Sequence, residues 1–430
     1  MRAVEEQVVQ PCPQCGVEIR GDRRFTVWCA ACDWNVDPQG PDRRKQGRLE
    51  RRRRRMAQRY GERLLEDLAG AAGRPERERP GRSAAGVLAY TVALLVHGVT
   101  LALFAGGLWF VIGGWGGFGM VAGLFLLGVA VTLRPRLNRL PAGAHTVSRT
   151  AAPELYALVD EVAVALGTRG VDVIVLDGQP NASVTHLGVR RRVLTLGLPL
   201  WEVLSPQERI ALLGHEFGHF THGDTRHGMV VGTAYGSLTT WHYYLSPIER
   251  PSGAEYVVNL FYFVPRWLIT GVVLLLDLLT TRASQRSEYL ADAAAARVGS
   301  SEAAAGLMDQ LLVAESIETT LYREVNARRM RGSARVSAQD AEGLWEALAT
   351  HLRSVPESEH ERRRRVSARR GHSVDATHPP THLRRTLLLR LPPTPASVTA
   401  DAGRTGRLAA ELADPRAAVA LELVRDGVDA

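Results

Sequence analysis

The chain has 430 residues, of which 45% are hydrophobic and 23% are charged, so it is long enough for two or three domains and too apolar for a disordered protein. Its four cysteines are too few for a small scaffold that depends on disulfides. The formal net charge of +8 rests on arginine, because Lys45 is the only lysine, and many arginines lie in 43–55 and 361–370. Such clusters predict an anionic neighbour, which can be a lipid headgroup, a nucleic acid or an acidic protein surface.

Residues 1–40 carry the cysteine pattern of a structural zinc site. The sequence before the first cysteine has an acidic pair and no apolar segment, so we expect no cleaved signal and a cytosolic N-terminus. Two Cys-x2-Cys pairs can hold one zinc ion tetrahedrally through four thiolates: Cys12, Cys15, Cys29 and Cys32. A closed four-thiolate site leaves no position for chemistry, so we predict a zinc ribbon that binds a partner. Two disulfides or free thiols are the alternative, which a reducing cytosol disfavours.

Residues 41–83 are rich in arginine, and their few leucines are too sparse for a core, so we predict a basic and partly helical linker. An apolar segment follows directly. Polybasic stretches before membrane segments contact anionic lipid or set the topology, and this is the favoured interpretation. Nucleic acid is the disfavoured partner, and a plain solvated spacer is the remaining alternative.

Residues 84–133 predict a transmembrane helical hairpin. The stretch 84–112 has no Asp, Glu, Lys or Arg and exceeds the roughly 20 residues that span the hydrocarbon core. A glycine-rich turn at 113–117 leads to a second apolar stretch that ends at Leu133. Arginines flank both ends, which places both ends in the cytosol. A buried helical pair in a soluble domain is the alternative.

Two later apolar stretches, 228–247 and 256–281, are weaker candidates for membrane segments. The second contains Pro265, Arg266 and Asp277, and a charge at the bilayer centre is costly unless it is paired or reaches the interface. The alternative for both is a helical arm that packs on the domain or lies in the membrane interface.

The segment 134–392 has the patterns of an α+β domain. Apolar residues at helical spacing predict a helix over 152–167. The apolar runs 171–177 and 191–201 predict two buried strands.

The motif HEFGH lies on a predicted helix that begins with a capping box. Ser205 can cap this helix, with Pro206 at its first position and Glu208 at its third. His215 and His219 are four residues apart and therefore share one helix face, so both imidazoles can reach one zinc ion. A surface helix with two histidines and no metal is the alternative.

Glu216 directly follows the first histidine of this motif. Its carboxylate can hydrogen-bond a zinc-bound water, accept the proton as the oxygen attacks a peptide carbonyl, and pass it to the leaving amine. The metzincin type is excluded, because its further glycine and histidine are replaced here by His222 and Thr225.

A third ligand is therefore expected on a later helix. The segment 282–299 is a predicted helix that carries Glu288 and, one turn later, Asp292. We expect Glu288 to bind the zinc and Asp292 to orient a ligating imidazole from behind. An ordinary acid on the surface of a helix is the alternative for Asp292.

These residues resemble the HtpX-type membrane zinc metalloproteases, a family related to the eukaryotic CAAX prenyl protease. The resemblance rests on four separated stretches, at 180–200, 212–224, 284–296 and 375–385. It implies a gluzincin-like protease that faces the cytosol, with the ligands and the base named above.

The resemblance implies further roles. Asn181 and Ala182 match a segment whose edge strand binds the substrate backbone, although a turn capped by asparagine is an alternative. His378 matches a histidine near the metal that could stabilise the oxyanion or hold the site. Arg384 has the same two possible roles, and we assign it to the support of the ligands.

The sequence departs from the family in three places. Gln285 stands where the family commonly has arginine, so the salt bridge expected there is in doubt. The zinc ribbon and the basic linker lie outside the shared domain. Residues 331–374 form an arginine-rich insertion that we predict to be a flexible loop or lid, although 344–355 could be helical. The tail 393–430 is predicted to be helical.

The sequence thus predicts a mainly α membrane protein: a small N-terminal zinc ribbon, a transmembrane helical hairpin and an α+β zincin-like metalloprotease domain. We expect a zinc endopeptidase with one catalytic and one structural Zn²⁺ in a multi-pass protein of the cell membrane. Its partners are protein or peptide substrates and membrane lipid, and misfolded or damaged membrane proteins are the substrates that the resemblance implies. A nonproteolytic membrane scaffold and a zinc-ribbon adaptor for nucleic acid or protein are the alternatives.

Overall fold

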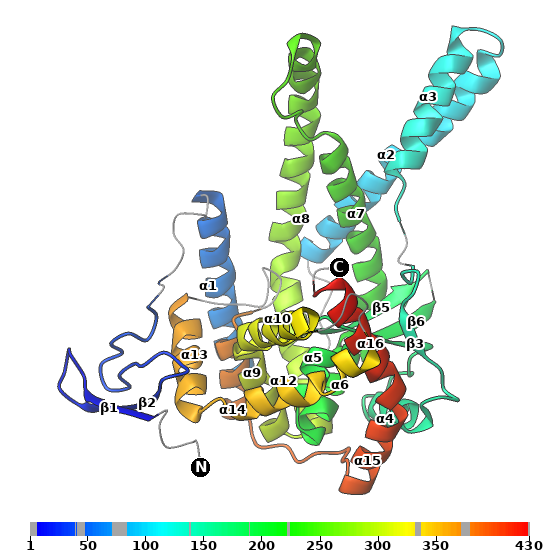
Figure 1. The fold of residues 1–430 in the computed structure, drawn as a ribbon. Helices are drawn as coiled ribbons and strands as arrows, with labels where there is room; N and C mark the ends of the chain where they lie inside the picture. Colours follow the sequence, from blue (N-terminus) through cyan, green and yellow to red (C-terminus); the bar gives the residue numbers. More distant parts are fainter. Residues whose placement is uncertain are drawn as a thin grey trace. The chain divides into compact units, whose positions relative to one another are not determined.

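The computed structural model describes residues 7–38, 40, 48–70, 84–136, 139–188, 190–221, 224–331, 337–370 and 379–428. The chain forms two compact units. The first unit comprises Met1–Pro75, Leu140–Thr221 and Gln285–Ala430, and the second comprises Glu76–Arg139 and His222–Ser284. Figure 1 shows a mostly helical chain with a small sheet.

The N-terminal segment forms a two-stranded antiparallel ribbon, with β1 (Gln7–Pro11) paired to β2 (Glu18–Asp22). Its small core consists of Cys12, Ile19 and Cys29, with Val27, Cys32 and Trp34 packed against them. Gly16, directly after the first Cys-x2-Cys pair, has a positive φ of 76°, which glycine adopts without strain.

The predicted basic linker contains α1 (Arg48–Gly70), so its partly helical character is confirmed. The expectation that its leucines are too sparse for a core is wrong. Leu64 and Leu65 are buried against Tyr289 and Leu387, and the hydroxyl of Tyr289 donates a hydrogen bond to the carbonyl oxygen of Gly61. The C-terminal half of α1 is therefore a packed part of the first unit.

A four-stranded sheet lies in the first unit, in the order β3-β4-β6-β5. Its strands are β3 (His145–Val147), β4 (Val173–Asp177), β5 (Ala182–Leu187) and β6 (Arg191–Gly197). β4 and β6 are parallel, and the other neighbours are antiparallel. The predicted strands correspond to β4 and β6, but β6 ends at Gly197 because Leu198 and Pro199 begin the short helix α5 (Leu198–Val203).

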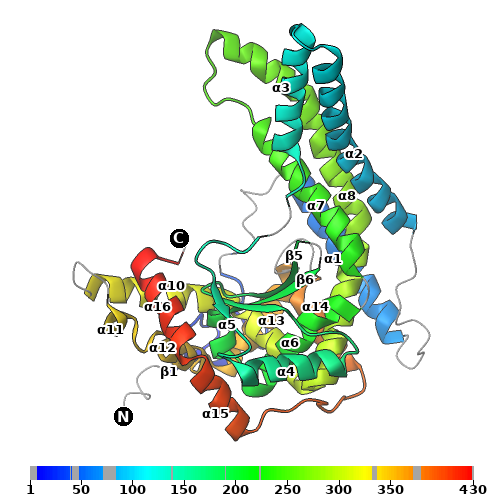
Figure 2. The same cartoon turned by 90° about the vertical axis from the view of Figure 1, so that its right-hand side faces the viewer.

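Helices α4 (Pro153–Ala165) and α6 (Pro206–Thr221) pack against each other and against the sheet (Figures 1 and 2). The buried faces of these elements form one continuous apolar core, which includes Leu155, Leu194, Leu213 and Phe217. This core places α6 beside β5, one of the two edge strands of the sheet.

Further helices complete the first unit. They are the end of α8 (Gly253–Gly299), α9 (Ser301–Leu312), α10 (Ala314–Arg331), α11 (Ala338–Ala341), α12 (Leu344–Arg353), α13 (Glu357–Arg370), α14 (Thr381–Arg390), α15 (Ala402–Glu411) and α16 (Ala413–Asp426). The prediction of a flexible loop or lid over 331–374 is wrong for 337–370, which are largely helical with Leu344 and Leu348 in the core. The predicted helical tail is confirmed by α15 and α16.

The second unit contains α2 (Ala84–Gly113), α3 (Phe118–Leu133), α7 (Asp224–Tyr244) and the first part of α8. Among the described helices, α2 and α8 are long and apolar enough to cross a membrane, whereas α3 is apolar but shorter. α2 and α3 pack very closely, since a Cβ atom on Gly123 would lie 2.6 Å from the backbone nitrogen of Val111. Many large apolar side chains of this unit are exposed, including Trp109, Phe125 and Trp267.

Candidate active site

The helix that carries HEFGH begins as predicted. The backbone N–H of Ser205 donates to Glu208 Oε2 at 2.7 Å, and the N–H of Glu208 lies 3.4 Å from Ser205 Oγ. This reciprocal capping box satisfies two of the free N–H groups at the start of α6. The helix then runs to Thr221 and buries His215, Glu216 and their neighbours.

Small residues bring the end of α8 very close to α6. A Cβ atom on Gly218 would lie 2.7 Å from the Cα atom of Ala291, and one on Gly214 would lie 3.0 Å from the Cα atom of Ala295. Contacts this short leave no room for a side chain at either glycine. Gly214 and Gly218 directly precede His215 and His219 in α6, so their close contact with α8 holds the histidines near Glu288 of that helix.

Three side chains meet at this contact with donor atoms that suit one metal ion. His215 Nε2 lies 3.5 Å from Glu288 Oε2, and His219 Nε2 lies 3.6 Å from Glu288 Oε1. Nitrogen and oxygen ligands at about 2.0–2.2 Å from a tetrahedral zinc ion lie about 3.3–3.6 Å apart, so both separations match those of zinc ligands. The side chain of His219 is 27% exposed, against 8% for His215 and 7% for Glu288, so solvent reaches the site beside His219.

Asp292 and Arg384 lie behind His215. Asp292 Oδ1 is 3.1 Å from His215 Nδ1, which leaves Nε2 of the same ring directed at Glu288. Arg384 donates to both oxygens of Asp292, from Nε at 2.8 Å and from Nη2 at 2.6 Å. Its Nη2 is also 3.6 Å from Glu288 Oε2. An aspartate that accepts the second N–H of an imidazole fixes the tautomer and the orientation of that ring.

The charges of this cluster are set by burial and by the ion pair. Burial raises the pKa of Asp292, but the guanidinium of Arg384 and the hydrogen bond with His215 lower it far more, so the carboxylate is ionised. Burial lowers the pKa of His215, whereas the hydrogen bond with Asp292 and the charges of the two carboxylates outweigh burial and raise it. The fixed anion behind the ring therefore makes the imidazole of His215 a stronger electron-pair donor to a metal ion.

Glu216 is buried in α6, one residue after His215. Successive helical residues are about 100° apart, so Glu216 lies beside the face that carries the two histidines. This is the position that the sequence predicts for a general base.

The residues matched to substrate binding lie at the edge of the sheet. Asn181 is exposed, its Oδ1 accepts the N–H of Ala182 at 2.8 Å, and its carbonyl oxygen accepts the N–H of Gly197 at 2.8 Å. These bonds form the turn into β5. β5 pairs with β6 alone among the described strands, so its other edge has no strand partner there. His186 of β5 contacts the ring of Phe220 on α6 at 5.5 Å between centroids, so this edge runs beside the metal-binding helix.

His378 and His222 lie outside the described residues. Gln285, the departure from the family pattern, is fully buried on α8. The close contact between α6 and α8 is not among the sequence-based predictions. Its signal in the sequence is the four-residue interval of Gly214 and Gly218, which puts both glycines on one helix face.

The four cysteines form a second cluster with the geometry of a metal site. Cys12 Sγ lies 3.6 Å from Cys32 Sγ, and Cys15 Sγ lies 3.6 Å from Cys29 Sγ. All four sulfurs lie within 4.8 Å of one another. These separations are too long for disulfides and close to the roughly 3.8 Å between thiolates on a tetrahedral zinc ion.

Comparisons with known proteins agree with this geometry. The model of Peptidase family M48 matches residues 149–390, more than half of the chain. The chain is 28% identical over 250 residues to a "Protease HtpX homolog" of Pyrobaculum calidifontis, which covers 56% of this chain and 68% of that protein. It is 27% identical over 234 residues to the homolog of Pyrobaculum aerophilum, 53% of this chain and 65% of that protein. The homolog of Thermodesulfovibrio yellowstonii is 28% identical over 152 residues, 35% of this chain and 53% of that protein.

No solved structure matches the chain. The family match spans both histidines of HEFGH, Glu288, Asp292 and Arg384, so the residues that meet in the structure all belong to the shared domain. This argues against a nonproteolytic scaffold. The chain belongs to Peptidase family M48 and is a metallopeptidase.

Proposed function

We propose that this chain is a zinc endopeptidase whose catalytic ion is held by His215, His219 and Glu288. The observation that carries the proposal is the spacing of their donor atoms, 3.5 Å and 3.6 Å, in a buried cluster backed by an ion pair. Two imidazoles and one carboxylate leave a fourth position open, which is typical of catalytic zinc sites. When bound, the ion supplies Lewis-acid polarisation of the scissile carbonyl and of the attacking water.

Glu216 is the general base in this proposal. Its carboxylate accepts a proton from the attacking water as the new bond to the carbonyl carbon forms, and it then gives the proton to the leaving amine. Because Glu216 is adjacent to His215 on α6, it is fixed by the same helix that presents the ligands. Peptide hydrolysis then needs no covalent intermediate with the protein.

Asp292 and Arg384 are positioning residues. Asp292 holds the ring of His215 through Nδ1, and Arg384 holds Asp292 through two hydrogen bonds. Because both oxygens of Asp292 accept from Arg384, the guanidinium is committed to this support, and we do not assign Arg384 to the oxyanion. Whether His378 stabilises the oxyanion stays a prediction.

We propose that substrates bind as an added strand along the edge of β5 that faces away from β6. Main-chain hydrogen bonds of this kind recognise an extended backbone more than particular side chains. The edge runs beside α6 through the contact of His186 with Phe220, so an added strand would pass the ligands. Unfolded segments meet this requirement, which favours misfolded or damaged membrane proteins as substrates.

A membrane location with several spans belongs to the same proposal. α2 and α8 are long and apolar enough to cross a bilayer, and the close glycine contacts of α2 with α3 suit a transmembrane hairpin. Arg134, Arg136 and Arg139 follow α3 and precede the family domain, so the positive-inside rule places that domain in the cytosol. We further propose that the four cysteines hold a structural zinc ion.

The test is cleavage of an unfolded model protein by the zinc-loaded, detergent-solubilised chain and by its Glu216→Gln variant. The variant keeps the three ligands and removes the base, so we expect unchanged zinc content and a loss of at least about 1,000-fold in kcat. Glu302→Gln, on the exposed first turn of α9, is the matched control and should retain full activity. Equal cleavage by wild type and Glu216→Gln would contradict the proposal.

A further inference from the structure

The arginine-rich helix α13 is neutralised within the chain. It carries six arginines in two runs, and each forms an ion pair with a carboxylate: Arg362, Arg363, Arg364, Arg365, Arg369 and Arg370. The acids come from three places, namely α13 itself, the zinc ribbon and helices α9 and α10. The anionic neighbour that the sequence predicts for this cluster is thus the protein's own surface.

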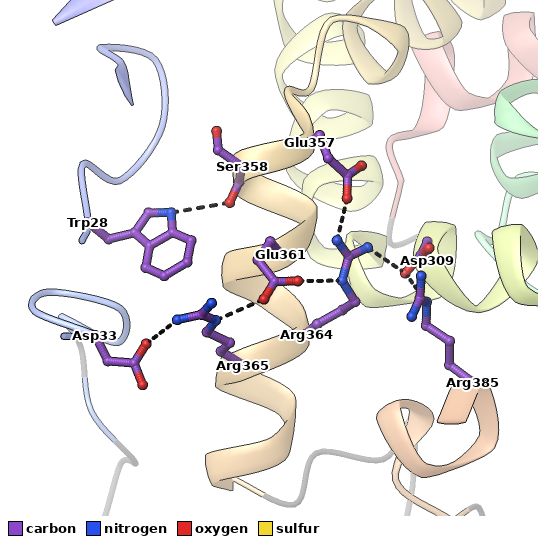
Figure 3. Close-up of polar contacts among 9 residues, drawn as sticks. All are labelled: Trp28, Asp33, Asp309, Glu357, Ser358, Glu361, Arg364, Arg365 and Arg385. Atoms are coloured by element: carbon purple, nitrogen blue, oxygen red, sulfur yellow. Dashed lines mark hydrogen bonds and ion pairs between the residues drawn. The ribbon is translucent and has the colours of Figure 1, made fainter. Parts of the chain in front are cut away.

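The zinc ribbon supplies the first group of contacts. Asp33 accepts from Arg365 at 2.6 Å and from Arg369 at 2.5 Å, and Asp37 pairs with Arg370. Figure 3 shows Asp33 and Trp28 facing α13. These acids lie in the loop that follows Cys29 and Cys32, so the fold of the cysteine site fixes their positions.

Apolar and backbone contacts make the interface more than a set of surface ion pairs. Trp28 and Val36 are buried against Val366 of α13. The indole N–H of Trp28 donates to the carbonyl oxygen of Ser358 at 3.2 Å. Arg362, which is buried, donates to the carbonyl oxygen of Val36 at 2.8 Å. Removal of the ribbon would take this acceptor from Arg362 and expose the apolar patch around Val366, and exposure of apolar area costs free energy.

The opposite side of α13 contacts the helices that support the active site. Asp309 Oδ1 of α9 lies 3.0 Å from Arg364 and 2.8 Å from Arg385 of α14, so one carboxylate joins α13 to α14 (Figure 3). Ser367 Oγ lies 3.2 Å from His382 Nδ1, which is a second link between the same helices. Arg385 directly follows Arg384, the residue that holds Asp292.

The ribbon is expected to need its metal ion in order to fold. Its core consists of two of its own cysteines and one isoleucine, with three further side chains packed around them. A segment of roughly 30 residues with so small a core is not expected to fold without a metal ion, because the bond energy of the metal supplies the folding free energy. Metal binding to the cysteines therefore decides whether the face that contacts α13 exists.

We propose that the metal-loaded ribbon clamps α13 and thereby controls the peptidase site: occupancy of the cysteine site holds α13 against α14, and α14 keeps Arg384 on Asp292. Loss of the ribbon metal releases α13, loosens α14 and weakens the support of His215. The insertion that contains α13 then serves to receive the ribbon, which explains why two parts outside the shared motifs contact each other. This inference rests on the peptidase activity proposed above.

The first experiment removes the ribbon metal from the full chain with the double substitution Cys29→Ser and Cys32→Ser. Zinc content, amide hydrogen exchange over 357–370 and 381–390, and kcat/KM on an unfolded protein are measured beside wild type. We expect one zinc ion fewer per chain, about tenfold faster exchange in both helices and about tenfold lower kcat/KM. Loss of the ribbon zinc with exchange and kcat/KM within twofold of wild type would overturn the inference.

The second experiment keeps the metal and breaks the interface with Asp33→Asn and Asp37→Asn combined. Asn suits position 33, where φ is 59°, so the ribbon can fold and keep its zinc. Glu18→Gln is the control, since Glu18 pairs with Arg20 within the ribbon hairpin. Faster exchange of α13 and α14 in the double variant alone supports the clamp, and unchanged exchange refutes it. If wild type itself cleaves nothing, the proposed function fails, while exchange still decides whether the ribbon holds these helices.

Discussion

Arg384 and Asp292 form a bidentate ion pair that is almost completely buried, with hydrogen bonds of 2.8 Å and 2.6 Å. The pair joins α14 to α8 and lies directly behind His215, whose Nδ1 is 3.1 Å from the same carboxylate. A buried ion pair contributes little net stability by itself, but loss of one partner leaves an uncompensated charge. Its place behind a metal-binding imidazole gives it a role in orientation.

Substitution Asp292→Asn should weaken catalytic zinc binding by about 10- to 100-fold, because the amide cannot supply the charge that supports His215. The ribbon zinc should remain. A competition titration against a zinc chelator measures both sites in one experiment. Asp160→Asn, at a half-exposed position on α4, is the control with the same chemical change. Retention of wild-type affinity in Asp292→Asn would show that the ligands are held without this carboxylate.

Gly218→Ala should destabilise the first unit although alanine favours helices. The added Cβ would lie 2.7 Å from the Cα atom of Ala291, so α6 and α8 must separate, at a cost of about 1–3 kcal/mol. Gly236→Ala on α7 is the matched control, since nothing lies within 4 Å of its Cβ position and alanine should stabilise that helix slightly. Thermal unfolding and zinc content are the measurements. Equal melting temperatures for the two variants would contradict the packing described here.

His382 should make the stability of the chain depend on pH. Burial lowers its pKa in the folded chain to about 4, whereas the unfolded value is about 6.5. Between these values the unfolded chain binds a proton that the folded chain does not, so stability falls as the pH falls from about 6.5 toward about 4. His382→Asn removes this titration and should lose less stability between pH 7 and pH 5 than wild type in chemical denaturation. Parallel pH profiles for the two proteins would exclude His382 as the cause.

The sequence was sufficient for features that depend on local spacing. The four-residue interval of His215 and His219, the capping box at Ser205 and the two Cys-x2-Cys pairs each follow from the geometry of one turn or one helix. Glu288 could be predicted as a ligand because the HEFGH motif has no third ligand close to it and a later predicted helix carries acids at helical spacing. In the structure the two histidines meet Glu288, the four cysteines form their own cluster, and the capping box is present at the start of α6.

Features that depend on contacts between residues far apart in the sequence could not be predicted from it. The arginine-rich composition of 331–374 favours a flexible loop or lid, because nothing in the local sequence indicates that Asp33 and Asp309 neutralise the arginines of α13. Leu64 and Leu65 were too few to predict a core because their partners, Tyr289 and Leu387, come from other helices. The family resemblance singles out Arg384. The position of Asp292 is needed to decide whether Arg384 stabilises the oxyanion or supports the metal ligands.

The most direct test of the central claim is a count of zinc ions per chain in wild type, in Glu288→Gln and in the double variant Cys29→Ser and Cys32→Ser. The account predicts two zinc ions in wild type and one in each variant after dialysis against a mild chelator. X-ray absorption should find only nitrogen and oxygen ligands in the cysteine variant and only sulfur ligands in Glu288→Gln. Wild-type zinc content in Glu288→Gln, or sulfur ligands in the cysteine variant, would contradict the assignment of the catalytic site.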